Sequence, residues 1–226
     1  MALSFDTSGV PGPHRNAPIF SLGPEPGAAP GVAPGMGAVV AIMLHGRGGA
    51  AQDILGLHGA MDLPGLSAIA PQAAGGTWYP QSFLAPGTVN QAGIESAHAL
   101  IEALIGQLAG LGVGSERVAL MGFSQGACLA LTHAARFPRR YALVAAFTGG
   151  LIGPPGTAFE FEGDLSGTPV FLGANDPDPH VPWARVSESA SVLERLGAAV
   201  TLVRYPGEPH AVNRDEIERV RGLLGG

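Results

Sequence analysis

The sequence contains no lysine, a single cysteine and no long run of basic or apolar residues. Charged residues make up only 13% of the 226, and the acidic residues outnumber the arginines by 18 to 12. An acidic chain without a basic run is poorly suited to binding nucleic acids or anionic membranes. We therefore predict that nucleic acid is not among the partners of this protein.

Other absences narrow the class of protein further. The lone Cys128 cannot form a disulfide within the chain, and the repeated Cys and His of zinc sites are missing, so we predict no bound metal. The longest clean apolar run, at 38–44, is far shorter than the ~20 residues that span a bilayer. The first ten residues include Asp6 and no basic residue, which argues against a secretory signal. We expect a cytoplasmic protein without a membrane span.

What is present is an apolar chain, 46% hydrophobic, whose 35 glycines and 20 prolines lie mainly between apolar runs. Strand patterns alternate with helix patterns, which is typical of a mostly parallel sheet with helices on both faces. We predict one domain over 1–226, beginning with an irregular lead-in at 1–37 that contains one edge strand near Phe20. The expected strands are 38–44, 66–70, 117–121, 142–147, 168–172 and 200–204, and the expected helices are 50–61, 91–111, 125–136, 183–196 and 214–224.

The strongest local signal is the sequence GFSQG at 122–126, between a predicted strand and a predicted helix. This is the context of a nucleophile elbow, in which a serine sits on a tight turn and its hydroxyl points out of the sheet. A G-x-S-x-G match alone is weak evidence in a glycine-rich chain. The flanking strand and helix make Ser124 the predicted nucleophile.

A second motif, LHGRGG at 44–49, follows the first buried strand. Nucleophile elbows work with an oxyanion hole made of two backbone amides, one just after the nucleophile and one in the loop after an earlier strand. The amides of Gln125 and Arg47 fit these positions. We interpret His45 as a structural histidine that hydrogen-bonds the loop, and the Arg47 side chain as a solvated charge.

The serine requires a base, and the order expected in this architecture is serine, acid, then histidine. His210 follows the last predicted strand and lies in a loop that can reach the elbow. The remaining histidines fit less well, because they precede the serine, lie on apolar helices where packing is the simpler interpretation, or lie in the loop of the acid. They are His14, His45, His58, His98, His133 and His180.

The acid is expected in the loop after the strand at 168–172, where the sequence reads GANDPDPHVP. Either Asp176 or Asp178 could accept a hydrogen bond from Nδ1 of His210 and stabilise the imidazolium. An aspartate before proline is also a common turn residue, so the residues alone leave both open. Cys128, one helical turn after Ser124, is interpreted as a buried small side chain.

Together these motifs resemble the phospholipase/carboxylesterase family of the α/β-hydrolase fold. The matching stretches are LHGRG at 44–48, Asp53, Trp78-Tyr79, GFSQGA at 122–127, DPHVP at 178–182, and Gly207 with His210. They run in the order of the family from about 38 to 224.

The resemblance implies an α/β-hydrolase fold without a large cap domain. It also implies Asp178 as the acid and a loop at Trp78-Tyr79 that lines the substrate pocket, although plain packing of these aromatics is the alternative. The implied activity is hydrolysis of small to medium carboxylic esters by a Ser-His-Asp triad, with no cofactor and with a homodimer as an open option. Thioesterase or lysophospholipase activity on the same triad is an alternative, and a non-catalytic binding protein of this fold is a second one.

Overall fold

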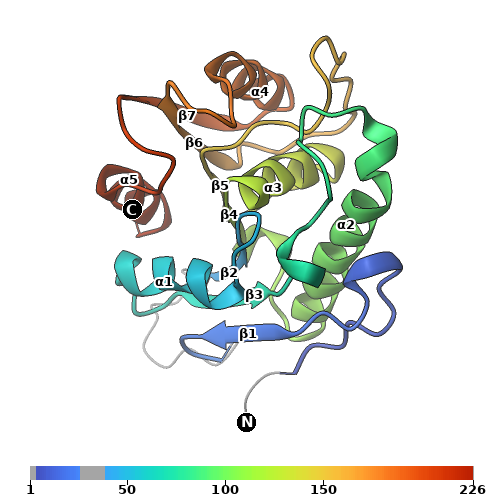
Figure 1. Cartoon of the computed structure of the whole chain (residues 1–226). Helices are drawn as coiled ribbons and strands as arrows, with labels where there is room; N and C mark the ends of the chain where they lie inside the picture. The colour runs from blue at the N-terminus through green and yellow to red at the C-terminus, as the bar shows by residue number, and fades with distance from the viewer. Residues whose placement is uncertain (1–3, 26–38, 226) are drawn as a thin grey trace.

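The computed structural model describes residues 4–25 and 39–225, which form a sheet covered by helices on both faces (Figure 1). The glycine- and proline-rich part of the lead-in at 26–38 lies outside the described residues. Ahead of it, the predicted edge strand is present as β1 (Ile19–Leu22). Within the described residues, no helix has both the length and the apolar character needed to cross a membrane.

In the described part of the chain, seven strands form one sheet in the order β1-β3-β2-β4-β5-β6-β7. Only β1 runs antiparallel to its neighbour β3, and the remaining pairs are parallel. The predicted mostly parallel sheet is therefore confirmed. The strands after β1 are β2 (Val40–Leu44), β3 (Ser67–Pro71), β4 (Val118–Phe123), β5 (Leu143–Phe147), β6 (Pro169–Asp176) and β7 (Ala199–Pro206).

The α-helices that cover the sheet in the residues described are five: α1 (Ala51–Met61), α2 (Gly87–Gly110), α3 (Gln125–Arg136), α4 (Trp183–Arg195) and α5 (Arg214–Gly225). All five were predicted, but α2 begins four residues earlier than expected, directly after Pro86. A proline at a helix start loses no intrahelical hydrogen bond, because the first amides of a helix have no acceptor within it.

Every residue of β2 is buried, and successive side chains enter two different cores. Val40, Ile42 and Leu44 pack into the core with α2, α3 and α4, whereas Ala41 and Met43 pack into the core with α1 and α5. This is why the central strands are continuous apolar runs instead of alternating apolar and polar residues.

The topology fixes where a site can form. From β2 the chain passes to β3 on one side and then to β4 on the other, so β2 and β4 flank a switch point. The loops that follow these two strands diverge there and leave a crevice at the carboxyl edge of the sheet. The motifs at 44–49 and 122–126 are these two loops.

Candidate active site

Ser124 occupies the turn between β4 and α3 in a strained backbone conformation, with φ 53° and ψ −114°. Residues other than glycine rarely adopt positive φ, so the surrounding contacts must hold the turn. The amide of Ser124 donates to the carbonyl of Phe147 on β5 at 2.9 Å, and its carbonyl accepts from the amide of Cys128 at 3.0 Å. The serine is thereby fixed to both the sheet and the first turn of α3.

Steric contacts explain the two glycines of the motif. A Cβ at Gly122 would lie 2.3 Å from the carbonyl carbon of Gly126, and a Cβ at Gly126 would lie 2.1 Å from the carbonyl oxygen of Leu44. Both distances are too short for any side chain. The spacing G-x-S-x-G therefore follows from the close approach of α3 to β4 and β2.

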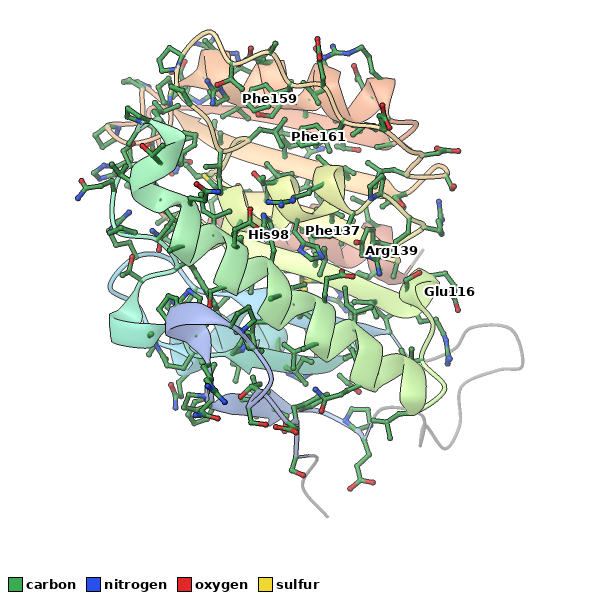
Figure 2. All side chains as sticks on the ribbon, turned by 90° about the vertical axis from the view of Figure 1, so that its right-hand side faces the viewer. His98, Glu116, Phe137, Arg139, Phe159 and Phe161 are labelled. Atoms are coloured by element: carbon green, nitrogen blue, oxygen red, sulfur yellow. The ribbon has the colours of Figure 1, made fainter. Side chains whose placement is uncertain are left out.

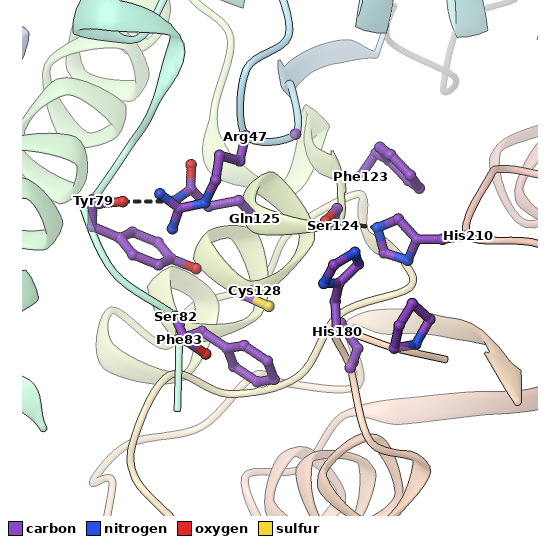
Figure 3. A pocket seen from close by; sticks show the side chains of 13 residues that line it. Arg47, Tyr79, Ser82, Phe83, Phe123, Ser124, Gln125, Cys128, His180 and His210 are labelled. Carbon is purple, nitrogen blue, oxygen red and sulfur yellow. Dashed lines mark hydrogen bonds between the residues drawn. The ribbon is translucent and has the colours of Figure 1, made fainter. Parts of the chain in front are cut away.

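Three side chains from three strand ends form one hydrogen-bonded chain, and Figure 3 shows its contact between Ser124 and His210. The Nε2 atom of His210, after β7, lies 2.9 Å from Oγ of Ser124. The Nδ1 atom of the same ring lies 2.6 Å from Oδ2 of Asp178, after β6. Because a carboxylate can only accept, Nδ1 carries the proton and Nε2 is left to accept from the serine hydroxyl.

Asp178 is held in its ionised form by its surroundings. Its side chain is fully buried, and its Oδ1 atom accepts hydrogen bonds from the amides of His180 and Val181, each at 2.8 Å. Burial acts to raise the pKa of this carboxyl, but the hydrogen bond from His210 and the two amides outweigh it and lower the pKa. Asp176, the other candidate, instead forms an ion pair with Arg204 on β7.

The loop of His210 is anchored by a residue that the sequence analysis missed. Asn175 is completely buried near the end of β6, and its side-chain amide donates to the carbonyls of Pro209 and Ala211, on either side of His210. The only signal for this role in the sequence is an asparagine that follows the apolar run of β6 and precedes Asp176. Asn175 sets where His210 leaves the sheet.

The amides predicted for an oxyanion hole belong to Gln125, which directly follows Ser124, and to Arg47. Gln125 is the first residue of α3, where backbone amides have no acceptor within the helix and the helix dipole favours negative charge. Arg47 lies in the loop after β2, and both residues line the same cavity as Ser124. The Gln125 side chain accepts from the amide of Trp78 at 2.9 Å and donates to the carbonyl of Tyr79 at 2.8 Å.

The Arg47 side chain is exposed, in keeping with its interpretation as a solvated charge, but it also has specific partners. Its guanidinium donates to the carbonyls of Pro80 and Gln81, at 2.8 and 2.6 Å, and to the hydroxyl of Thr77 at 3.2 Å. It also lies 5.9 Å from the centre of the Tyr79 ring. The backbone carbonyls of Pro80 and Gln81 act as acceptors for the guanidinium. The sequence gives no indication that this loop approaches Arg47.

His45 has the structural role expected of it. Its Nδ1 atom lies 2.7 Å from the carbonyl of Gly46, and its Nε2 atom accepts from the amide of Ala73 at 3.1 Å. Burial lowers the pKa of His45, in keeping with a neutral ring. Trp78 is fully buried and donates its indole N–H to the carbonyl of His45 at 2.8 Å, so it supports this loop from within.

A cavity of about 500 Å³ opens beside the serine, and Figure 3 shows side chains around it. Of the predicted pair Trp78 and Tyr79, the structure places Tyr79 on the cavity wall. Cys128 also faces it, but burial raises the pKa of this thiol to about 12, which keeps it protonated. The cavity is also lined by three ring-bearing residues that we did not predict for this role, namely Phe83, Phe123 and His180.

Within the residues that the structure describes, no cluster of three His, Cys, Asp or Glu side chains could hold a metal ion. The sheet order and the strained serine between β4 and α3 define the molecule as an α/β-hydrolase-fold protein, as predicted.

Residues 37–224 match the family model of the phospholipase/carboxylesterases, and the chain belongs to this family. It is similar to a phospholipase/carboxylesterase from Dyadobacter fermentans, with 40% identity, a TM-score of 0.86, and coverage of 93% of this chain and 97% of the other. Esterase PE8 is 26% identical, with a TM-score of 0.74 and coverage of 92% and 98%.

Acyl-protein thioesterase 1 of Neurospora crassa is 25% identical over 60% of this chain and 56% of that protein. The chain spans about half of the length of the curated relatives that it matches.

Proposed function

We propose that this protein is a serine hydrolase that cleaves small to medium carboxylic esters through an acyl-enzyme. The observation that supports this most strongly is the continuous hydrogen-bonded chain from Ser124 through His210 to Asp178, placed at the wall of a cavity. Such a chain makes a hydroxyl nucleophilic, because the imidazole takes its proton as it attacks.

In the first step, Oγ of Ser124 attacks the ester carbonyl carbon while Nε2 of His210 accepts the hydroxyl proton. The carbonyl oxygen becomes an oxyanion and is stabilised by the amides of Arg47 and Gln125; each such donor contributes ~10²–10³ in rate. The imidazolium then gives its proton to the leaving alcohol as the carbon–oxygen bond breaks. Asp178, ionised and buried, stabilises the charged ring throughout.

In the second step, a water molecule replaces the alcohol. His210 takes one proton from the water as its oxygen attacks the acyl carbon, and the second tetrahedral intermediate is held by the same two amides. Collapse of this intermediate breaks the bond to Ser124, which recovers its proton from His210. The products are an alcohol and a carboxylic acid, and no cofactor takes part.

The volume of the cavity limits the size of the substrate that it can bind. About 500 Å³ is within the range of small-molecule sites, which bury most of a ligand of modest size. A thioester is the second candidate for the substrate, because a relative of this chain is named an acyl-protein thioesterase. Lysophospholipid hydrolysis is a third option on the same residues, since phospholipases share the family description.

Hydrolysis of 4-nitrophenyl acetate and butyrate by a Ser124→Ala variant tests the proposal. We expect kcat to fall by about 10⁴–10⁶, the loss seen when a triad nucleophile is removed. Ser191→Ala, which changes an exposed serine of α4, is the matched control and should retain full activity. If folded Ser124→Ala protein turned over both esters at the control rate, the proposal would be wrong.

A further inference from the structure

His14 is buried in the molecule, although it belongs to the lead-in before the first strand. It ends the short helix η1 (Gly12–His14), which lies against α2, as Figure 1 and Figure 2 both show. The amide of His14 donates to Oγ of Ser96 on α2 at 2.9 Å, and that hydroxyl donates to the carbonyl of Pro11 at 2.5 Å. These contacts fix the position from which the His14 ring enters the interior.

The ring of His14 joins the two ends of a short segment, 74–78. Its Nε2 atom lies 3.0 Å from the carbonyl oxygen of Trp78, and its Nδ1 atom accepts from the amide of Ala74 at 3.2 Å. Because a carbonyl can only accept, Nε2 carries the proton and Nδ1 keeps its lone pair. One neutral tautomer satisfies both contacts, and burial lowers the pKa of His14, in keeping with this neutral form.

The segment 74–78 contacts the first of the two residues whose amides we assign to the oxyanion hole. The carbonyl of Gly76 accepts from the amide of Gly48 at 2.8 Å. Since Gly48 directly follows Arg47, this hydrogen bond restricts the backbone at Arg47. The guanidinium of Arg47 also donates to the hydroxyl of Thr77 at 3.2 Å.

The same segment contacts the second of these residues, Gln125. The amide of Trp78 donates to Oε1 of Gln125 at 2.9 Å, and the hydroxyl oxygen of Thr77 lies 3.1 Å from the same atom. Gln125 is buried at the start of α3, directly after Ser124. A displacement of the segment 74–78 would therefore disturb contacts of both oxyanion residues.

Two histidines from distant parts of the chain hold consecutive amides beside this segment. The amide of Ala73 donates to His45, and the amide of Ala74 donates to His14. The ring of Trp78 contacts both imidazoles, with centroid distances of 5.3 Å to His14 and 5.0 Å to His45. His45 belongs to the motif after β2, whereas His14 lies outside every motif that the sequence analysis identified.

We propose that His14 is a positioning residue for the oxyanion hole. By joining the ends of the segment 74–78, its ring preserves the contacts through which this segment orients Arg47 and Gln125 toward the carbonyl oxygen of the ester. His14 does not belong to the described lining of the cavity at Ser124, so it acts through the segment and not on the substrate. This role rests on the hydrolase proposal.

Kinetics of His14→Leu with 4-nitrophenyl butyrate test this role. Loss of both ring contacts should lower kcat by ~10–10²-fold and change KM by less than about twofold, because the negative charge on the oxygen develops only in the transition state. The Ki of phenylboronic acid, which forms a tetrahedral adduct on the serine, should rise by the same factor. Misfolding alone lowers the concentration of active enzyme and leaves this Ki unchanged. An unchanged Ki in folded His14→Leu protein would overturn the proposal.

Two polar variants keep the test valid if His14→Leu does not fold. His14→Asn offers an acceptor near the position of Nδ1, and His14→Gln offers a donor near the position of Nε2. Each can therefore keep one of the two ring contacts, to Ala74 or to Trp78, and each should raise the Ki of phenylboronic acid several-fold. A Ki that stayed at the parent value in both variants would equally overturn the proposal.

His58→Leu is the matched control, because it also removes a histidine that bonds the backbone. His58 is a half-buried residue of α1, and its Nε2 atom lies 2.9 Å from the carbonyl oxygen of Leu66. This variant should keep the kcat and Ki of the parent, and a rise in Ki equal to that of His14→Leu would contradict a specific role of His14. A parent protein that hydrolysed no ester would contradict the hydrolase proposal, whereas an active parent with unchanged His14 variants would contradict only the role of His14.

Discussion

Two aspartates only two residues apart have different partners. Asp176 ends β6 and faces Arg204 on the neighbouring strand, whereas Asp178 lies in the loop beyond and contacts His210. From the residues alone either could have been the acid. Their directions depend on how far β6 continues, and β6 extends four residues beyond the predicted end because its pairing with β7 continues to Asp176 and Pro206.

Substitution of each aspartate in turn separates their roles. Asp178→Asn should lower kcat for a nitrophenyl ester by about 10⁴, because the amide no longer fixes the tautomer of His210 or stabilises the imidazolium. Asp176→Asn should change kcat by no more than a few-fold, since its partner is Arg204. Steady-state kinetics of the two variants measures this, and a larger loss from Asp176→Asn would reverse the assignment.

At the scale of elements, α5 begins with a reciprocal cap beneath the loop of His210. The amide of Asn213 donates to Oε2 of Glu216 at 2.9 Å, and the amide of Glu216 donates to the Asn213 side chain at 3.0 Å. Glu216 is completely buried, and its other oxygen has no partner among the described residues. Burial, with a smaller contribution from Asp215, raises the pKa of Glu216 from 4.5 to about 7.

This carboxyl should make stability depend on pH. Because the pKa is higher in the folded state, protonated Glu216 stabilises the fold; the effect is complete below about pH 4.5 and is lost as the pH rises through about 7. The loss is on the order of 3 kcal/mol. Glu216→Gln should remove it, so urea unfolding at pH 5 and pH 8.5 should differ less for the variant than for the parent. An equal pH dependence in both proteins would contradict this origin.

The helices and strands could be predicted from the sequence because each of them must bury at least one apolar face. The apolar runs identified the central strands, and the glycines around Ser124 identified the turn, since both follow from local packing and sterics. Apart from the contacts of the predicted Ser-His-Asp triad, contacts between distant side chains were not predictable. The carbonyls that bind Arg47 and the pairing of His98 with His133 depend on how separate elements meet, and no spacing in the sequence encodes that.

At the scale of the whole molecule, the early and late parts of the chain are interleaved. β1 pairs with β3, β2 lies between β3 and β4, and α1 packs against α5. Within the described residues 4–25 and 39–225, no group of elements separates cleanly from the rest. The single domain over 1–226 stays a prediction. The cytoplasmic location and the homodimer stay predictions.

A single domain should unfold in one cooperative transition. Fluorescence reports on the surroundings of the buried Trp78 and of Trp183 at the start of α4, and far-ultraviolet circular dichroism reports on the helices. In urea the two signals should give the same midpoint. Midpoints that differ beyond error, or a plateau between two transitions, would indicate separately folding parts.

We propose that the fold activates one hydroxyl, that of Ser124, among the serines of the chain. Reaction with a fluorophosphonate probe, followed by peptide mass spectrometry, measures this directly. We expect one adduct, on Ser124, that is absent from Ser124→Ala and forms at least ~10²-fold more slowly in His210→Gln, where the base is missing. If the folded protein did not react, or if the Ser124→Ala variant reacted equally well, Ser124 would not be the activated serine.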